Sequence, residues 1–140
     1  MIIRATIENR AGDNRVTLAT NGNARALDIP PKATGPGSSA NGGELLFLAL
    51  ATCYCNDIYR EAALRGIQVE QVEVEVEGEF GGPGDPARHV RYRARVTANA
   101  SEADILDLMR HTDTVAEIQN TLRQSSTVEL STIEAVSVET

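Results

Sequence analysis

The side chains best suited to chemistry in this sequence are those of two cysteines, Cys53 and Cys55. A cysteine thiolate is a nucleophile and a metal ligand, whereas a free thiol within an apolar helix is usually a small structural hydrophobe. Two positions apart on a helix, the two side chains point about 200° away from each other. We therefore expect that they neither form a disulfide with each other nor share a metal ion.

Other kinds of active site find little support in the sequence. His89 and His111 are the remaining soft ligands, and we expect no metal site and no bound cofactor. The Gly-rich segment 30–43 is not followed by Gly-Lys-Ser or Gly-Lys-Thr, so it does not resemble a phosphate-binding loop. No nucleophile-elbow motif supports serine hydrolysis. The cysteines therefore remain the candidates.

The composition limits the class of protein. The chain of 140 residues has 13 Lys and Arg against 20 Asp and Glu, a net charge of −7, which argues against nucleic acid as the main partner. No run of about 18 apolar residues occurs, so we expect no membrane span. The first residues lack the pattern of a secretory signal, and two cysteines do not make a disulfide framework. We expect one cytoplasmic domain over residues 1–140.

Cys53 lies in the strongest predicted helix, residues 44–65, which is rich in Leu and Ala and ends before Gly66. Residues 45–55 are apolar on nearly every face, so this half of the helix is predicted to form the centre of the core. The preceding segment 30–43 contains many Pro and Gly residues, and it is either a connector or a functional loop.

A thiol in such a helix ionises readily only near positive charge. Arg10, Arg15 and Arg25 lie in the N-terminal part of the chain, and any of them could supply that charge. The sequence therefore does not decide which of these three arginines lies beside Cys53.

Two segments alternate apolar and charged side chains and predict an antiparallel hairpin. Residues 72–80 carry an acid at every second position, and residues 90–96 carry arginines in the same way. The register that sets acids against bases also brings the apolar side chains together on the other face. The predicted pairs are Glu77–Arg91, Glu75–Arg93, Glu73–Arg95 and Glu79–His89. Exposed pairs contribute only about 0.2–1 kcal/mol, so this ladder specifies register; an acidic binding stripe is the alternative.

The remaining segments complete an α+β pattern. Short strands are predicted at residues 2–9, 15–20 and 24–29, with a hairpin turn at Asn21-Gly22. Ser101 is predicted to cap a second helix, and Thr112 or Asp113 a third. Residues 127–138 are predicted to form a final strand. The predicted order βββ–α–ββ–αα–β indicates an α+β fold with antiparallel sheets and a long buried central helix.

The segment SSANGGELLFLALATCYCND resembles the core helix of the OsmC/Ohr family, in which a Gly/Ser-rich loop leads into a helix with a reactive cysteine. Cys53 and Asp57 match the cysteine and an aspartate four residues later. The segment NTLRQSSTVEL resembles a late part of the same family, and the order of elements matches over nearly the whole chain.

The resemblance implies an intertwined homodimer with its active sites at the subunit interface, and reduction of organic hydroperoxides by a cysteine thiolate. An arginine from the N-terminal region and a glutamate at the start of the core helix hold that thiolate ready. Here they correspond to Arg10, with Arg15 as the alternative, and to Glu44. The implied partners are a second copy, an organic hydroperoxide and a thiol reductant.

The sequence departs from the family pattern at two positions. Aligned on the NTLR segment, the family's second, resolving cysteine falls at Ala116. Aligned on Cys53, the family's glutamate falls at Gly43, one residue before Glu44. Glu44 is therefore expected either to cap the helix or to bind an arginine.

Three hypotheses follow. In the first, Cys53 is the peroxidatic thiol of a one-Cys hydroperoxide reductase, with a thiol pKa well below that of free cysteine. In the second, the fold is not catalytic and binds a small apolar or thiol ligand at the dimer interface, with Phe47, Leu48 and Met109 as candidate lining residues. In the third, the protein is a structural dimer.

Overall fold

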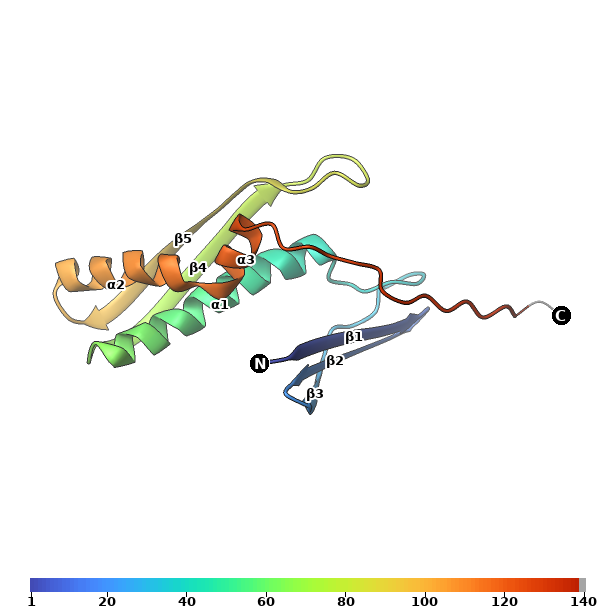
Figure 1. The fold of residues 1–140 in the computed structure, drawn as a ribbon, viewed down its shortest axis with the longest axis horizontal. Helices are drawn as coiled ribbons and strands as arrows, with labels where there is room; N and C mark the ends of the chain where they lie inside the picture. Colours follow the sequence, from blue (N-terminus) through green and yellow to red (C-terminus); the bar gives the residue numbers. More distant parts are fainter. Residues whose placement is uncertain (139–140) are drawn as a thin grey trace. The chain divides into compact units, whose positions relative to one another are not determined.

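The computed structural model describes residues 1–138 and has the predicted α+β architecture (Figure 1). The elements in chain order are β1 (Ile3–Arg10), β2 (Asp13–Thr20), β3 (Asn23–Leu27), α1 (Gly42–Leu64), β4 (Gln68–Glu79), β5 (Arg88–Asn99), α2 (Glu102–Val115) and α3 (Glu117–Arg123).

The chain divides into two compact units. The first contains Met1–Ala49 and Val76–Arg91, and the second contains Leu50–Glu75 and Tyr92–Thr140. Helix α1 and strands β4 and β5 each contribute residues to both units. A single domain over residues 1–140 stays a prediction.

The first unit contains a three-stranded antiparallel meander in the order β1-β2-β3 (Figure 1). The turn between β2 and β3 is at Asn21-Gly22, where φ is 49° and 82°. Both residues adopt the left-handed conformation that a tight hairpin turn needs, and Asn and Gly tolerate it best. The hairpin predicted from this dipeptide is confirmed.

The buried core of the second unit is built on the later part of α1. Tyr54 (3% exposed), Ile58 (0%) and Ala62 (1%) follow one another at helical spacing, and Leu108 of α2 (0%) packs with them. The Tyr54 ring meets the Tyr92 ring edge-on at 5.1 Å between centroids. Further apolar side chains packed against this core are Ile67, Val69, Val72, Val74, Ala94, Val96 and Met109.

The predicted position of the core along α1 is wrong for a single chain. Residues 45–55 were expected to be its centre, but Leu48 is 59% exposed, and of these residues only Leu50 and Tyr54 are buried. The reason is that the alternating valines of β4 and the helix α2 pack on the half of α1 that starts near Tyr54. An apolar helix pattern indicates burial but does not say which partner provides it.

Strands β4 and β5 pair with each other and carry the predicted ion-pair ladder. Arg91 Nε lies 2.7 Å from Glu77 Oε1, Arg93 Nη2 lies 2.8 Å from Glu75 Oε2, and His89 Nε2 lies 3.4 Å from Glu79 Oε1. Glu73 and Arg95 line one shallow pocket on the same strand pair. The predicted register is therefore confirmed at three of its four pairs.

The helices after β5 differ from the prediction in one boundary. Ser101 caps α2 by accepting a hydrogen bond from the Asp104 N–H over 3.2 Å, as predicted. The third helix begins at Glu117 instead of near Asp113, because α2 continues to Val115 and the chain turns at Ala116, whose backbone is extended. This shift places Glu117 and Ile118 at the first turn of α3.

Residues 127–138 form no strand within one chain, contrary to the prediction (Figure 1). Their apolar side chains are almost fully exposed: Val128 97%, Leu130 83%, Ile133 78%, Val136 80% and Val138 90%. A strand requires a neighbouring strand for its backbone hydrogen bonds, and no described segment of this chain pairs here. Among the described residues, no helix is both long and apolar enough to cross a membrane.

Candidate active site

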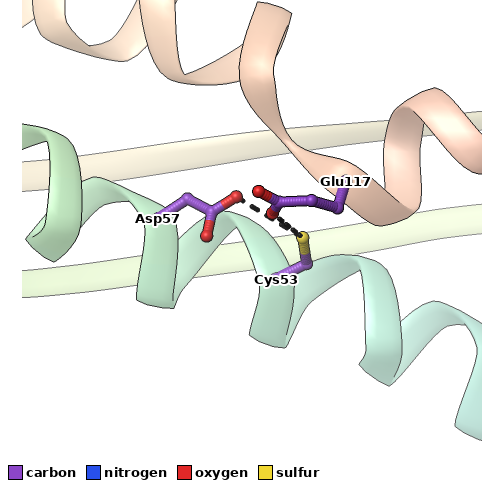
Figure 2. Close-up of side chains that lie close together, drawn as sticks. All are labelled: Cys53, Asp57 and Glu117. Carbon is purple, nitrogen blue, oxygen red and sulfur yellow. Dashed lines mark hydrogen bonds between the residues drawn. The ribbon is translucent and has the colours of Figure 1, made fainter. Parts of the chain in front are cut away.

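Cys53 lies on α1 with its Sγ among polar groups (Figure 2). The thiol is 3.6 Å from Oδ2 of Asp57 and 3.6 Å from Oε1 of Glu117. The backbone N–H of Ile118 donates a hydrogen bond to Sγ over 3.5 Å. The side chain of Cys53 is half-buried. This thiol is therefore not sealed in an apolar interior.

Two structural features bring these groups together. Asp57 follows Cys53 by one helical turn on α1, so both side chains lie on the same face, and Asp57 is buried (6% exposed). Helix α3 is held against α1 by Gln119, whose Nε2 donates to the backbone oxygen of Leu50 over 3.0 Å. This hydrogen bond anchors the first turn of α3 beside Cys53.

The turn at Ala116 orients the start of α3. Ala116 is fully buried and has an extended backbone (φ −73°, ψ 114°), which separates α2 from α3. The first N–H groups of a helix have no partner within the helix. One of them, that of Ile118, points at the Cys53 sulfur. The residues that follow Ala116, the position aligned with the family's second cysteine, therefore contact the sulfur of Cys53.

Arg60 completes a closed set of contacts with these groups. Its Nη1 is 3.1 Å from Oδ1 of Asp57 and 2.9 Å from Oε2 of Glu117. Each carboxylate thus directs one oxygen to Arg60 and the other to the sulfur of Cys53. We call Cys53, Asp57, Arg60 and Glu117 the thiol–carboxylate cluster.

The cluster continues on the far side of Arg60. The Nε of Arg60 is 2.9 Å from Oε2 of Glu61, and Oε1 of Glu61 is 2.8 Å from Nε2 of His111 on α2. Hydrogen bonds to Arg60 and His111 hold the pKa of Glu61 below its usual range, so Glu61 is an anion at neutral pH. Arg60 therefore faces three carboxylates and is the shared cation of the network.

The electrostatic environment of Cys53 is the opposite of the one predicted. Burial raises the pKa of the Cys53 thiol, the N–H of Ile118 opposes this rise, and the negative charges of Asp57 and Glu117 add to it. The predicted low pKa of Cys53 is therefore wrong for the contacts within one chain. The reason is that the nearest charged groups are two carboxylates, with the guanidinium one contact further away.

The two carboxyl groups of the cluster titrate as a pair. Burial raises the pKa of Asp57 to about 6, and the neighbouring Glu117 adds to that rise. The hydrogen bond with Asp57 lowers the pKa of Glu117 to about 2. The pair therefore takes up one proton as the pH falls through about 6.

The spacing of three possible ligand atoms in the cluster also resembles that of a cation site. One ligand atom each from Cys53, Asp57 and Glu117 lies within 4.8 Å of the other two. However, the guanidinium of Arg60 already contacts both carboxylates and offsets part of their charge. The arrangement among residues 1–138 is therefore that of a thiol linked to a carboxylate pair and an arginine.

The other predicted site residues have contacts of their own in the first unit. Arg10 Nη2 is 3.5 Å from Oε1 of Glu8, and both side chains are exposed. Its alternative, Arg15, has its Nε 3.2 Å from Oδ2 of Asp13. The predicted position of Arg10 or Arg15 beside Cys53 stays a prediction.

Glu44 caps the start of α1. Its Oε1 accepts from the N–H of Asn41 over 3.0 Å, and its own N–H donates to Oδ1 of Asn41 over 2.8 Å. This reciprocal pair is the capping arrangement that satisfies two backbone donors at a helix start. At Gly43, a Cβ would lie 2.8 Å from the Phe80 ring, so a side chain at the position aligned with the family's glutamate would require that ring to move. A role of Glu44 toward Cys53 stays a prediction.

Cys55 lies apart from the cluster contacts. It lines a shallow pocket of about 250 Å³ with Ala51, Thr52, Asn56, Val72 and Val74. Both cysteines are free thiols, as their spacing on the helix predicts.

Two members of the cluster, Arg60 and Glu117, were not predicted from the sequence. Helical spacing indicates that Arg60 shares a face of α1 with Asp57 and Cys53, because it follows Asp57 by three positions and Cys53 by seven. Glu117 adjoins Ala116, the position aligned with the family's second cysteine, and this alignment is the signal for its proximity to Cys53.

Comparison with known proteins identifies the family. The model of the family described as OsmC-like protein matches residues 35–131, which is more than half of the chain. The chain belongs to the OsmC-like family. This assignment confirms the resemblance drawn from the core helix and the NTLR segment, and the matched range includes all four residues of the thiol–carboxylate cluster.

Solved structures of OsmC-like proteins share the fold. An OsmC-like protein from Mycoplasma pneumoniae is 19% identical with a TM-score of 0.61, covering 87% of this chain and 89% of the other. An OsmC-like protein of unknown function from Vibrio cholerae is 14% identical with a TM-score of 0.59, covering 86% and 93%. An OsmC-like hydroperoxide resistance protein from Jannaschia is 16% identical with a TM-score of 0.53, covering 86% of each chain. No curated protein sequence matches this chain.

Proposed function

We propose that this OsmC-like protein is a thiol-dependent hydroperoxide reductase with Cys53 as its peroxidatic thiol. The observation that carries the proposal is the half-buried sulfur of Cys53, which contacts two carboxylates and a backbone N–H instead of apolar side chains alone. Membership in a family that includes a protein named for hydroperoxide resistance supports the substrate class. The substrate is an organic hydroperoxide.

The proposed cycle uses a single cysteine of the protein. Sulfur attack on the hydroperoxide converts Cys53 to a sulfenic acid and releases the alcohol. Position 116, which the family alignment assigns to the resolving cysteine, holds a buried alanine. An external thiol therefore condenses with the sulfenic acid, with loss of water, and a second thiol reduces the mixed disulfide. The use of external thiols fits the reducing, cytoplasmic location that we expect.

The proposal is tested by consumption of cumene hydroperoxide with dihydrolipoamide and, separately, with a monothiol as reductant. We expect Cys53→Ser to lose all measurable turnover because serine cannot form the sulfenic acid. Cys55→Ser is the matched control and should retain turnover, since Cys55 lies outside the thiol–carboxylate cluster. Equal rates in the wild type and Cys53→Ser would refute the assignment of Cys53.

A non-catalytic binding protein is the second candidate, and the raised pKa of the Cys53 thiol favours it. In that case the fold binds a small apolar or thiol ligand without reducing it. The same experiment separates the two candidates: a wild-type protein that consumes no hydroperoxide with either reductant would leave the binding function as the better proposal.

We further propose that the protein is a homodimer in which residues 127–138 pair with a second copy. These residues carry apolar side chains on an extended segment that forms no strand within one chain, with Leu130 83% exposed and Ile133 78% exposed. A second copy would supply both the missing strand partner and the apolar cover. In such a dimer we expect Arg10 and Glu44 to contribute to the site around Cys53.

The dimer is tested by light scattering after size-exclusion chromatography. We expect the wild type to have twice the mass of the 15.0 kDa chain. Leu130→Asp should raise the dimer dissociation constant by at least about tenfold, because it removes a large apolar side chain from the segment that the second copy would cover. Glu129→Asp, the neighbouring conservative change, should leave it unchanged. A wild-type protein that is monomeric at all concentrations would contradict the proposal.

A further inference from the structure

The two carboxylates beside Cys53 present a problem for a mechanism that starts from a thiolate. A peroxidatic cysteine usually ionises because positive charge lies close to its sulfur. Here Asp57 and Glu117 each place an oxygen 3.6 Å from Sγ, and their charge opposes ionisation. Carboxylates in this position are suited to receive a proton from the thiol.

The geometry divides the four carboxylate oxygens into two pairs. Oδ1 of Asp57 and Oε2 of Glu117 contact Nη1 of Arg60, at 3.1 and 2.9 Å. Oδ2 of Asp57 and Oε1 of Glu117 remain directed at the sulfur (Figure 2). Arg60 therefore holds both groups in place and lets them approach each other, while the oxygens that face Cys53 stay available as proton acceptors.

We propose that Asp57 and Glu117 form a proton relay for Cys53, which lets the neutral thiol react with a hydroperoxide. This inference rests on the proposed function and adds catalytic roles to it. One carboxylate oxygen accepts the thiol proton as Sγ attacks, and the pair then donates that proton to the leaving alkoxide. Arg60 is a positioning residue, because it acts through the two carboxylates.

The step balances without any further reactant. Sγ attacks the terminal oxygen of the hydroperoxide, forming an S–O bond while the O–O bond breaks and its electron pair leaves with the alkoxide. The thiol proton passes to Asp57 or Glu117 and from there to the alkoxide, which becomes the alcohol. Cys53 is oxidised to sulfenic acid, the hydroperoxide is reduced, and the carboxylate pair returns to its starting state.

The groups that surround the sulfur support this role. The charged groups linked to Cys53 are Asp57 and Arg60 on α1 and Glu117 on α3, with Glu61 of α1 and His111 of α2 beyond Arg60. The pKa of Asp57 is raised to about 6, so the pair is free to accept a proton at neutral pH and returns it readily. The side chain of Glu117 is 57% exposed and that of Cys53 is half-buried, so neither group is sealed from solvent.

The test compares two reactions of Cys53 over pH 5–10. The first is sulfenic acid formation with cumene hydroperoxide, trapped and measured by mass spectrometry; the second is alkylation by iodoacetamide. All proteins carry Cys55→Ser so that only Cys53 reacts. The variants are Glu117→Gln and Asp57→Asn, and Glu102→Gln at an exposed position on α2 is the control.

Alkylation requires the thiolate, so its rate should rise about tenfold per pH unit up to the raised thiol pKa. The rate of oxidation should instead rise as the pH rises through about 6 and then remain level, because the carboxylates of Asp57 and Glu117 supply the base. Glu117→Gln should slow oxidation at pH 7 by at least about tenfold and yet speed alkylation, because it removes both a base and a negative charge. Asp57→Asn should act in the same sense, and Glu102→Gln should change neither rate.

A purely structural role would not produce opposite changes in the two rates. If oxidation and alkylation have the same pH profile in the wild type, or if Glu117→Gln speeds both, the relay is refuted while Cys53 remains the peroxidatic thiol. If cumene hydroperoxide does not oxidise Cys53 at any pH, both the relay and the proposed function fail.

Discussion

Ile58→Ala is expected to lower the free energy of unfolding by about 2–5 kcal/mol. Ile58 lies on α1 with no exposed surface, and Leu108 of α2 and the rings and valines of the core pack around it. Removing its larger side chain loses apolar burial and leaves a cavity between helices and strands that cannot fully close. The same segment of α1 carries Asp57, so the loss should also loosen the cluster.

The measurement is urea unfolding followed by circular dichroism at one fixed protein concentration, since association with a second copy would make stability concentration-dependent. Leu64→Ala is the matched control on the same helix, because Leu64 is 79% exposed, and its effect should stay within about 0.5 kcal/mol. An Ile58→Ala protein as stable as the Leu64→Ala protein would show that the core does not lie where the structure places it.

Ala116→Cys is expected to convert the proposed one-Cys cycle into a two-Cys cycle. Its neighbours Glu117 and Ile118 both contact the sulfur of Cys53, at 3.6 and 3.5 Å, so a thiol at position 116 starts close to the sulfenic acid. The new thiol attacks the sulfenic sulfur, forming a disulfide and releasing water. Most molecules should then carry an intramolecular disulfide after one equivalent of cumene hydroperoxide.

Mass spectrometry of the unreduced protein detects this disulfide, and reductant assays should show a shift in preference from monothiols to dithiols. Ala116→Ser is the matched control of similar size and should behave as the wild type. Position 116 is fully buried, so a larger side chain costs about 1–3 kcal/mol, and unfolding curves establish that the variant is folded. A folded variant that accumulates sulfenic acid without the disulfide would contradict the placement of Ala116 beside Cys53.

Local spacing accounts well for several elements of the fold. The Asn21-Gly22 dipeptide predicted a hairpin because few other residues tolerate its left-handed turn, and φ there is 49° and 82°. The acid and base alternation predicted the β4–β5 register, and the 2.7 Å contact of Arg91 with Glu77 confirms it. Both signals act between neighbouring strands, where only one register satisfies the pattern.

The location of the core was less predictable. The apolar residues 45–55 indicated burial, yet Leu48 is 59% exposed in one chain. Residues 127–138 were likewise expected to form a strand, and no described segment pairs with them. Hydrophobic patterns reveal that a face needs a partner, but they do not reveal whether the partner is in the same chain.

Local sequence and tertiary structure determine different parts of the candidate site. The helix and the common face of Cys53 and the aspartate one turn later could be inferred from residues that are close in sequence, because helical periodicity sets that face. The contact of Glu117 with Cys53, 64 positions earlier, could not be inferred from local spacing, since it depends on the turn at Ala116 and the packing of α3 on α1. That packing places carboxylates beside the sulfur where sequence alone suggested arginines, and the negative charge of these carboxylates opposes ionisation of the thiol.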